Sequence, residues 1–360
     1  MAASTASRLS PPRLHAAPNH PLRRSRFSPL RAAKLEAVLS IGTHVIPHPR
    51  KVETGGEDAF FVGGDGGGVF AIADGVSGWA EKNVNPALFS RELMANSSTF
   101  IKDEEVSQDP QILLMKAHAA TSSIGSATVI VAMLEKTGTL KIASVGDCGL
   151  KVIRKGQVMF STCPQEHYFD CPYQLSSEAI GQTSQDALVC TVNLMEGDMI
   201  VSGSDGFFDN IFDQEILAVI NESPGTDEAA KALAELARKH SVDVTFDSPY
   251  SMEARSRVRN KYILPVILSL FTSFFSSFAK KIYDITHFIP VTYMQGFDVP
   301  WWKKLLGAKL VGGKMDDITV IVAQVKTVVI PDDEGSGIEL EKVGGEQLAA
   351  AGVASAEQSE

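Results

Sequence analysis

The sequence lacks the cysteine patterns that would build a zinc site or a secreted disulfide framework. Its 360 residues include only four cysteines, and none stands in a CxxC pair or beside a histidine at zinc spacing. Free thiols in a reducing compartment are therefore expected. Cys163 and Cys171 are the one pair whose spacing leaves a redox bridge open as an alternative.

A surplus of positive charge is also missing from the chain as a whole. The net charge is −10 and the isoelectric point is near 5.4, which argues against nucleic acid as the main partner. The fraction of hydrophobic residues is 44%, enough for a substantial core.

The first 34 residues differ sharply in composition from the rest. They contain no Asp or Glu but seven Lys or Arg, with many Ser, Ala and Pro, and no continuous apolar stretch of the kind that directs secretion. This composition predicts a transit peptide over residues 1–34, for a chloroplast before a mitochondrion, because Ser and Pro interrupt an amphipathic helix. The alternative is a disordered basic tail that carries no targeting signal. Removal of these residues would take the net charge to −10 − 7 = −17.

The apolar pattern predicts an α+β layered sandwich with long antiparallel strands and helices on their faces. Strands are predicted at residues 35–47, 59–64, 69–75, 126–135, 138–147, 149–160, 187–198, 199–206 and 316–326. Helices are predicted at residues 85–101, 109–121, 213–220 and 226–240, the first, second and fourth with Asn85, Asp109 and Thr226 as N-caps. The first three strands follow one another so closely that antiparallel hairpins are expected between them.

Acidic residues stand at the ends of five apolar strands, beside glycine or another acid. They are Glu57-Asp58, Asp74, Asp147, Asp205 and Asp316-Asp317. Carboxylates gathered near a core repel one another and lose hydration, unless a cation compensates them. Ligation by oxygen alone suits Mg²⁺ or Mn²⁺, whereas zinc would require His or Cys.

The order of these acidic segments and the sequences around them resemble those of the metal-dependent type 2C protein phosphatases. The matching pieces are "GGED", "ADGVSGW", "GSATVIVAMLE", "ASVGDCGLKVI", "SGSDGFFDN" and "DDITVIVA", spread over about residues 38 to 326 with one interruption. The resemblance implies a four-layer α/β/β/α sandwich with two antiparallel sheets, over a domain at residues 35–328. It also implies a protein serine/threonine phosphatase that holds two Mg²⁺ or Mn²⁺ ions per site, with attack on the phosphate by a metal-bridging hydroxide. The chain has no CxxxxxR loop for a cysteine nucleophile, which agrees.

The resemblance also assigns the metal ligands. Asp74 would bridge both ions and Gly75 would lend its carbonyl, while Asp205 and Asp316 would complete one ion. Glu57 and Asp58 would hold the other ion through waters. Asp74, Asp205 and Asp316 are therefore the candidate catalytic residues.

Two positions depart from the family pattern. Val76 stands where a histidine commonly follows Asp-Gly and protonates the leaving alcohol, a loss that could cost about 10²-fold to 10⁴-fold unless His44, His48 or a bound water substitutes. Glu53 stands where an arginine commonly binds phosphate. Arg50 or Lys51 could replace that arginine, the alternative being a solvated basic pair.

Both departures are shared by an organellar branch of the family. The stretches "HPRKVETGGEDAFFV" and "EHYFDCPYQLSS" resemble plant chloroplast members that act on phosphothreonines of photosystem II core subunits in the thylakoid. The expected partners are thus phosphorylated thylakoid proteins, the expected location is the chloroplast stroma or thylakoid surface, and a monomer is expected. The alternatives are a mitochondrial phosphatase of the same branch and a phosphatase-shaped scaffold that binds phosphoprotein with little turnover.

One apolar segment interrupts the domain at residues 258–295. It contains 18 consecutive uncharged residues, 262–279, flanked by Arg and Lys. That length could barely span a bilayer, so a membrane element, a buried or partner-binding helix and a translated, unspliced intron all remain open. Residues 329–360 are rich in acids, Gly and Ala, and disorder is expected there.

Overall fold

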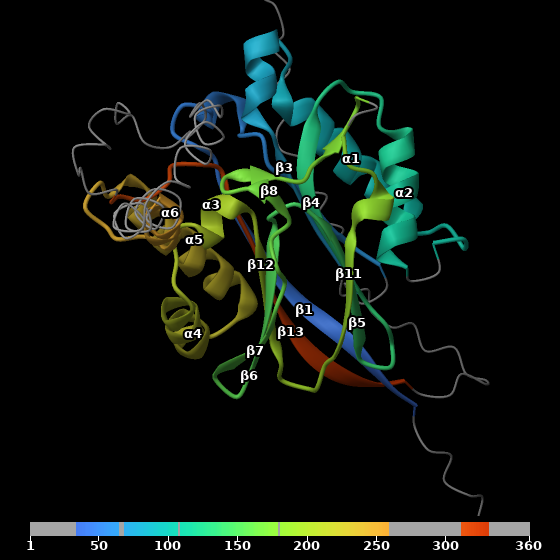
Figure 1. Cartoon of the computed structure of the whole chain (residues 1–360). Coiled ribbons are helices and arrows are strands. Elements are labelled where there is room, and N and C mark those ends of the chain that lie inside the picture. The colour runs from blue at the N-terminus through green and yellow to red at the C-terminus, as the bar shows by residue number, and fades with distance from the viewer. Residues whose placement is uncertain (1–33, 65–67, 107–108, 179–180, 259–310, 331–360) are drawn as a thin grey trace, which may run out of the picture.

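Two antiparallel sheets form the centre of the structure, a computed structural model that describes residues 34–64, 68–106, 109–178, 181–258 and 311–330 (Figure 1). The strand order is β1-β13-β12-β6-β7 in one sheet and β11-β5-β4-β3-β2 in the other, where β10 also pairs with β4. The first sheet contains β1 (Lys34–Ile46), β6 (Gly149–Arg154), β7 (Gln157–Ser161), β12 (Met199–Gly203) and β13 (Ile318–Ile330). The second contains β2 (Ala59–Gly63), β3 (Val69–Gly75), β4 (Ser126–Leu134), β5 (Thr139–Val145), β10 (Leu175–Ser176) and β11 (Leu188–Asn193).

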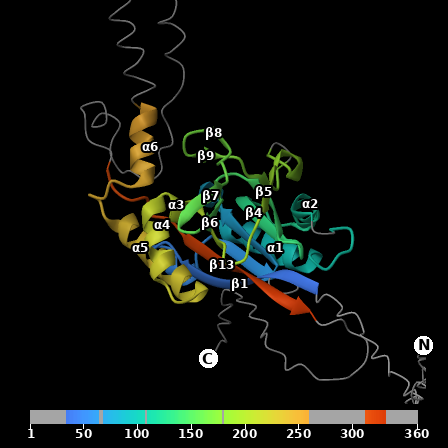
Figure 2. The same cartoon turned by 90° about the horizontal axis from the view of Figure 1, so that it is seen from below.

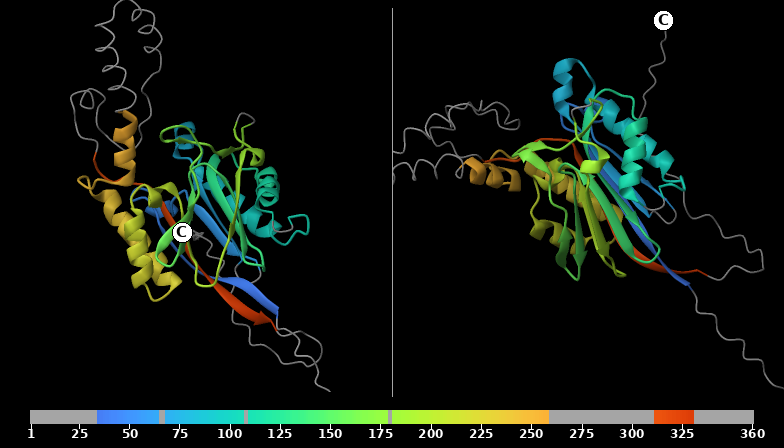
Figure 3. Two further views of the ribbon diagram at one scale, coloured as in Figure 1. Left: turned by 60° about the horizontal axis from the view of Figure 1, so that its bottom comes forward. Right: turned by 45° about the vertical axis from the view of Figure 1, so that its right-hand side comes forward.

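Helices cover the outer face of each sheet, as Figures 2 and 3 show. The second sheet is covered by α1 (Pro86–Phe100) and α2 (Pro110–Ala120). The first is covered by α3 (Asp205–Phe208), α4 (Asp213–Glu222) and α5 (Thr226–Val242). The described chain also contains α6 (Pro249–Val258), the hairpin of β8 (Glu166–Tyr168) with β9 (Cys171–Pro172), and the 3-10 turns η1 (Val52–Thr54), η3 (Ser77–Lys82) and η4 (Ser184–Asp186). The predicted four-layer α/β/β/α sandwich is confirmed.

Three separate apolar cores explain why the structure has four layers. Strand β3 sends Phe70 and Ile72 into the core between the sheets, and its alternate residue Ala71 into the core under α1 and α2. Strand β13 likewise sends Ile321 between the sheets and Val320 under α5. Successive residues of a strand point to opposite faces, so a strand covered on both faces is apolar throughout. This is why the central strands read as unbroken hydrophobic runs.

Two of the three predicted helix caps are confirmed. The side chain of Asn85 accepts a hydrogen bond from the backbone of α1, Asp109 does the same for α2, and each is followed by proline. The prediction for Thr226 is wrong. Gly225 is the N-cap of α5 and offers no side-chain bond, and Thr226 is the first helical residue.

The first and last described strands are partners. Strand β1 pairs with β13 from Lys34 opposite Ile330 to Ile46 opposite Ile318, and the two run side by side in Figure 1. Strand β2 pairs with β3 in the other sheet. The expected hairpin between β1 and β2 is therefore wrong, because β1 meets a partner from the far end of the chain.

Residues 1–33 of the predicted transit segment, 259–295 of the apolar interruption and 331–360 of the acidic tail lie outside the described residues. The predicted bounds are wrong by one or two residues, because Lys34 begins β1 and Val329 and Ile330 end β13. Within the described ranges, no helix is both long and apolar enough to cross a membrane. Cys163 and Cys171 carry free thiols, as do Cys148 and Cys190.

Candidate metal centre

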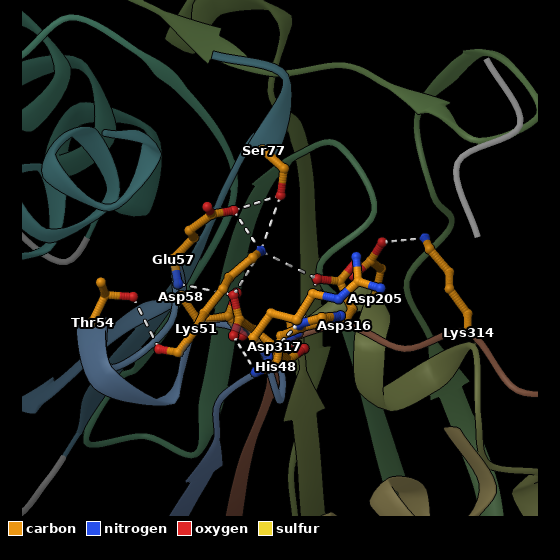
Figure 4. Close-up of polar contacts among 12 residues, drawn as sticks. His48, Lys51, Thr54, Glu57, Asp58, Ser77, Asp205, Lys314, Asp316 and Asp317 are labelled. Atoms are coloured by element: carbon orange, nitrogen blue, oxygen red, sulfur yellow. Dashed lines mark hydrogen bonds and ion pairs between the residues drawn. The ribbon is translucent and has the colours of Figure 1, made fainter. Parts of the chain in front are cut away.

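Segments that are distant in sequence bring Glu57, Asp58, Asp205, Asp316 and Asp317 to one place (Figure 4). Glu57 and Asp58 precede β2, Asp74 lies near the end of β3, Asp205 begins α3, and Asp316 and Asp317 precede β13. Direct contacts join these segments. The Asp58 carboxylate accepts a hydrogen bond from Thr319 Oγ1 at 2.7 Å, and the backbone N–H of Glu57 donates to Asp317 Oδ2 at 2.8 Å.

Asp317 holds the loop that carries Lys51. Its carboxylate accepts hydrogen bonds from the backbone N–H groups of His48, at 2.6 Å, and Glu57, at 2.8 Å. Gly56 lets the loop pass this close, since its φ is +81° and an added Cβ would lie 2.6 Å from Asp317 Oδ1. The second acid of the pair therefore organises the loop, while Oδ1 of the first, Asp316, accepts a hydrogen bond from the backbone N–H of Asp317 at 2.9 Å.

Of the two candidate phosphate-binding residues, the structure brings only Lys51 into the centre. Its ammonium nitrogen lies 2.6 Å from Glu57 Oε2, 3.0 Å from Ser77 Oγ and 3.3 Å from Asp317 Oδ2. Burial alone would lower the pKa of Lys51, but Asp316, Asp317 and Glu57 outweigh it and raise the pKa, so the side chain stays charged. Arg50 and Glu53 are exposed.

The carboxyl groups lie near enough to act on one another's pKa. Burial raises the pKa of Asp58 to about 8, with Asp317 adding to the effect, and burial with the charge of Asp205 raises the pKa of Asp316 to about 7. Burial, followed by the charges of Asp58, Asp205 and Asp316, raises the pKa of Asp74 well above its ordinary value. The pKa of Asp74 and that of Asp316 thus both respond to the charge of Asp205.

Buried carboxylate oxygens without partners show that the site fits divalent cations. Oδ1 of Asp58, Oδ1 of Asp147 and Oδ1 of Asp205 are buried and accept no hydrogen bond. Among the described residues, however, no group of three or more His, Cys, Asp and Glu side chains already has the arrangement of a metal site. Unpartnered buried carboxylates are costly, and hard cations with oxygen ligands would offset that cost. The donor set thus suits Mg²⁺ or Mn²⁺.

The glycine of the Ser-Asp-Gly motif is required by close packing. Gly206 lies so near β13 that an added Cβ would overlap the backbone oxygen of Asp317. This contact sets α3, and with it Asp205, against the second acidic pair.

No histidine occupies the position after Asp74-Gly75, where Val76 donates its backbone N–H to the oxygen of Ser126. His44 lies within β1, opposite Val320. His48 lies at the edge of the site, where burial and the charge of Lys51 lower its pKa, and its Nδ1 accepts a hydrogen bond from the backbone of Arg50. That His44, His48 or a bound water donates the proton in place of the missing histidine stays a prediction.

Lys314, Asp170 and Asp209 also lie at the centre but are absent from the predicted site. The ammonium of Lys314 contacts Asp205, Asp209 and Asp170 at 2.7–3.2 Å. A signal for Asp209 exists in the sequence, because it follows Asp205 by four positions and so lies on the same side of a helical turn. Lys314 lies two residues before Asp316, but the direction of its side chain depends on the fold and cannot be predicted from the sequence.

Comparisons with known proteins identify relatives over the whole length, although no family model matches the chain. "Probable protein phosphatase 2C 1" of Oryza sativa subsp. japonica is 75% identical over 364 residues, covering 100% of this chain and 98% of the relative. "Probable protein phosphatase 2C 26" of Arabidopsis thaliana is 52% identical over 301 residues, covering 84% of this chain and 87% of the relative.

A solved structure matches as well. The X-ray structure of the photosystem II phosphatase PBCP is 76% identical in sequence and aligns with a TM-score of 0.66, over 80% of this chain and 99% of that one. The chain is 75% identical to one protein phosphatase 2C along its full length and 52% identical to a second over 84% of it. It therefore belongs to the protein phosphatase 2C family, whose members are protein serine/threonine phosphatases that use Mg²⁺ or Mn²⁺.

Proposed function

We propose that this phosphatase acts in the chloroplast on phosphothreonine and phosphoserine of thylakoid proteins, the core subunits of photosystem II above all. The observation that carries the proposal is the 76% identity to a photosystem II phosphatase over 99% of that protein's structure. The composition of residues 1–34, basic and free of acids, supports the location.

The proposed ligands are the six residues that the family pattern assigns. They are Glu57, Asp58, Asp74, Gly75, Asp205 and Asp316. When bound, two divalent ions supply hydroxide at neutral pH and neutralise charge on the phosphoryl oxygens. Asp58 and Asp205 each offer a buried oxygen that has no other partner, which suits them to hold such ions.

Lys51 is the proposed phosphate-binding residue. Its ammonium lies 3.9 Å from Asp316 Oδ1 and within hydrogen-bond distance of Ser77, with 21% of the side chain exposed. A phosphate beside the metal ions would thus meet a fixed positive charge that is open to solvent on one side. Such a charge orients the phosphoryl group for in-line attack.

Phosphate release from a phosphothreonine peptide tests the enzymatic part of the proposal. Mn²⁺ or Mg²⁺ is expected to stimulate release, and Asp205→Asn is expected to lower kcat/KM by about 10²-fold or more. Asp213→Asn is the matched control, because Asp213 lies in the first turn of α4 and contacts Lys151 at 3.1 Å. Absence of turnover with either metal would favour the scaffold alternative.

Phosphorylated thylakoid membranes test the substrate. The enzyme is expected to remove phosphothreonine from photosystem II core subunits at least about tenfold faster than from an unrelated soluble phosphoprotein, since a tenfold preference requires only about 1.4 kcal/mol of additional transition-state binding. Equal rates on both substrates would contradict this assignment while leaving the phosphatase activity intact.

A further inference from the structure

The side chain of Lys314 ends in a cage of aspartates. Its Nζ lies 2.7 Å from Asp205 Oδ2, 3.0 Å from Asp209 Oδ2 and 3.2 Å from Asp170 Oδ1. The residue is only 8% exposed, and the ring of Tyr250 covers the ammonium at 5.0 Å from the ring centroid. Three carboxylate oxygens around one buried nitrogen form an environment that is otherwise typical of a hard metal cation.

Several elements fix this arrangement. Asn210 clamps the backbone of Lys314, since its amide donates to the Lys314 oxygen at 2.8 Å and accepts from the Lys314 N–H at 2.9 Å. Asp170 comes from the turn between β8 and β9 and accepts a hydrogen bond from the hydroxyl of Tyr250, on α6, at 3.0 Å. The lysine therefore joins the β8–β9 hairpin and α6 to the start of α3.

The cage brings three acidic side chains to one buried cation. Asp170, Asp205 and Asp209 each place a carboxylate oxygen 2.7–3.2 Å from the Lys314 ammonium, which is their shared counter-charge. Without the ammonium, ionised aspartates would be buried together with no counter-charge, which is strongly unfavourable.

The two oxygens of Asp205 have different roles. Oδ2 binds Lys314, whereas Oδ1 is buried and has no partner. A carboxylate held through one oxygen cannot turn freely, so the other oxygen keeps a constant direction.

We propose that Lys314 is a positioning residue that acts as a built-in counter-cation: it takes the place of a metal ion among Asp170, Asp205 and Asp209, and it presents Oδ1 of Asp205 to the catalytic metal. The inference rests on the proposed metal centre. Its test does not depend on turnover, so failure here is distinguishable from failure of the proposed function.

The test compares the full chain with its Lys314→Met variant in chelator and in excess Mn²⁺. In chelator the variant is expected to melt about 10 °C lower than the wild type, because removing one partner of a buried ion pair leaves unpaired charge. Mn²⁺ is expected to raise the Tm of the variant by more than it raises that of the wild type. Titration calorimetry is expected to find one more Mn²⁺ bound per variant chain, in the place of the ammonium.

Lys116→Met is the control, because Lys116 also bridges two acids, Asp103 and Glu105, but lies on α2. It is expected to keep the wild-type Mn²⁺ stoichiometry. Wild-type stoichiometry and a wild-type response of Tm to Mn²⁺ in Lys314→Met would overturn the proposal.

A double variant keeps the test decisive if Lys314→Met does not fold in chelator. Lys314→Met with Asp209→Asn removes one buried negative charge together with the ammonium. It is expected to recover part of the lost Tm in chelator, since the excess charge is smaller. No recovery would contradict the role of Lys314 as a counter-cation.

Discussion

Neighbouring residues of the acidic centre differ in what they contact. Burial and the charge of Asp205 raise the pKa of Asp316. Both carboxylate oxygens of Asp317, in contrast, accept hydrogen bonds from the backbone of the Lys51 loop. The same contrast separates Lys51, whose ammonium lies among Glu57, Ser77 and Asp317, from the exposed Arg50. Position in the fold decides which of two similar side chains serves the site.

Substitution of Lys51 is expected to impair catalysis. Lys51→Met should lower kcat/KM on a phosphothreonine peptide by about 10²-fold, because a preorganised charge beside the phosphate is lost. Arg50→Met, the control, should remain close to the wild type, since the Arg50 side chain is exposed. A larger loss in Arg50→Met than in Lys51→Met would reverse the assignment. Steady-state kinetics at saturating Mn²⁺ measures both.

Glu57, Asp58, Asp74, Asp205 and Asp316 could be singled out because each lies at an end of an apolar strand, a pattern that is visible along the chain. Asp170 could not, because it lies in the short turn between β8 and β9. The choice between Arg50 and Lys51 could not be predicted, because both lie in one short loop and only its folded path separates them. Lys314 escaped prediction for a related reason. A lysine near an acidic pair is ordinary in sequence, and its burial depends on Asn210 and Tyr250 from other elements.

Among the elements, α1 is tied to the connection between α2 and β4 through Glu92. The Glu92 carboxylate accepts hydrogen bonds from the backbone N–H groups of Ser123, at 2.8 Å, and Ser122, at 3.0 Å, and from the Ser122 hydroxyl at 2.9 Å. The bonds from Ser123 and Ser122 lower the pKa of Glu92 from 4.5 to about 2. The carboxylate form is therefore the one that stabilises this junction.

The sign of the resulting pH dependence follows from the lowered pKa. The stabilisation is present above pH 4.5, the ordinary value, and is lost as pH falls through about 2. Glu92→Gln is thus expected to lower Tm at pH 7, with a difference from the wild type that shrinks toward pH 2. Thermal unfolding across that range checks it, with the exposed Glu81→Gln as control. A difference independent of pH would contradict the role of the charge.

Packing of α3 against β13 gives a second prediction at this scale. Gly206→Ala is expected to cost about 2–3 kcal/mol of unfolding free energy, because the new Cβ would overlap the Asp317 backbone. Gly78→Ala should be nearly neutral, since an added Cβ there meets nothing within 4 Å. Denaturant unfolding of both variants provides the measurement. Equal stability of the two would contradict this packing.

Long apolar strands and capped helices could be predicted from sequence, since their signals are local. Asn85-Pro86 and Asp109-Pro110 marked the starts of α1 and α2 because cap and proline chemistry needs only adjacent residues. The short strands β8, β9 and β10 went unpredicted, because two or three residues carry no periodicity. The partner of β1 went unpredicted because it lies almost 300 residues away.

In the molecule as a whole, the chain on either side of the apolar interruption is joined by hydrogen bonds. Gly312 N–H donates to the oxygen of Phe246 at 2.9 Å, Gly313 N–H donates to that of Asp243 at 3.0 Å, and Ser248 Oγ donates to the oxygen of Gly312 at 2.8 Å. These bonds hold the segment before α6 against the segment that leads to Asp316.

Deletion of residues 258–295 is therefore expected to preserve both Tm and Mn²⁺-dependent peptide turnover. The two assays used on the full chain measure this directly. Loss of turnover in the shortened protein would show that the interruption contributes to the site. Transcript sequencing across Arg257 and Gly296 separately tests whether the interruption is an unspliced intron.

The pairing of β1 with β13 has a consequence for how the protein is made. A ribosome releases β1 before the other described strands and β13 after them, so the edge of β1 stays without its partner strand until almost the entire domain has been synthesised. Asp316 and Asp317 emerge just ahead of that closing strand. The enzyme therefore cannot assemble its acidic centre on a partly synthesised chain, and dephosphorylation can begin only after translation has passed the last strand.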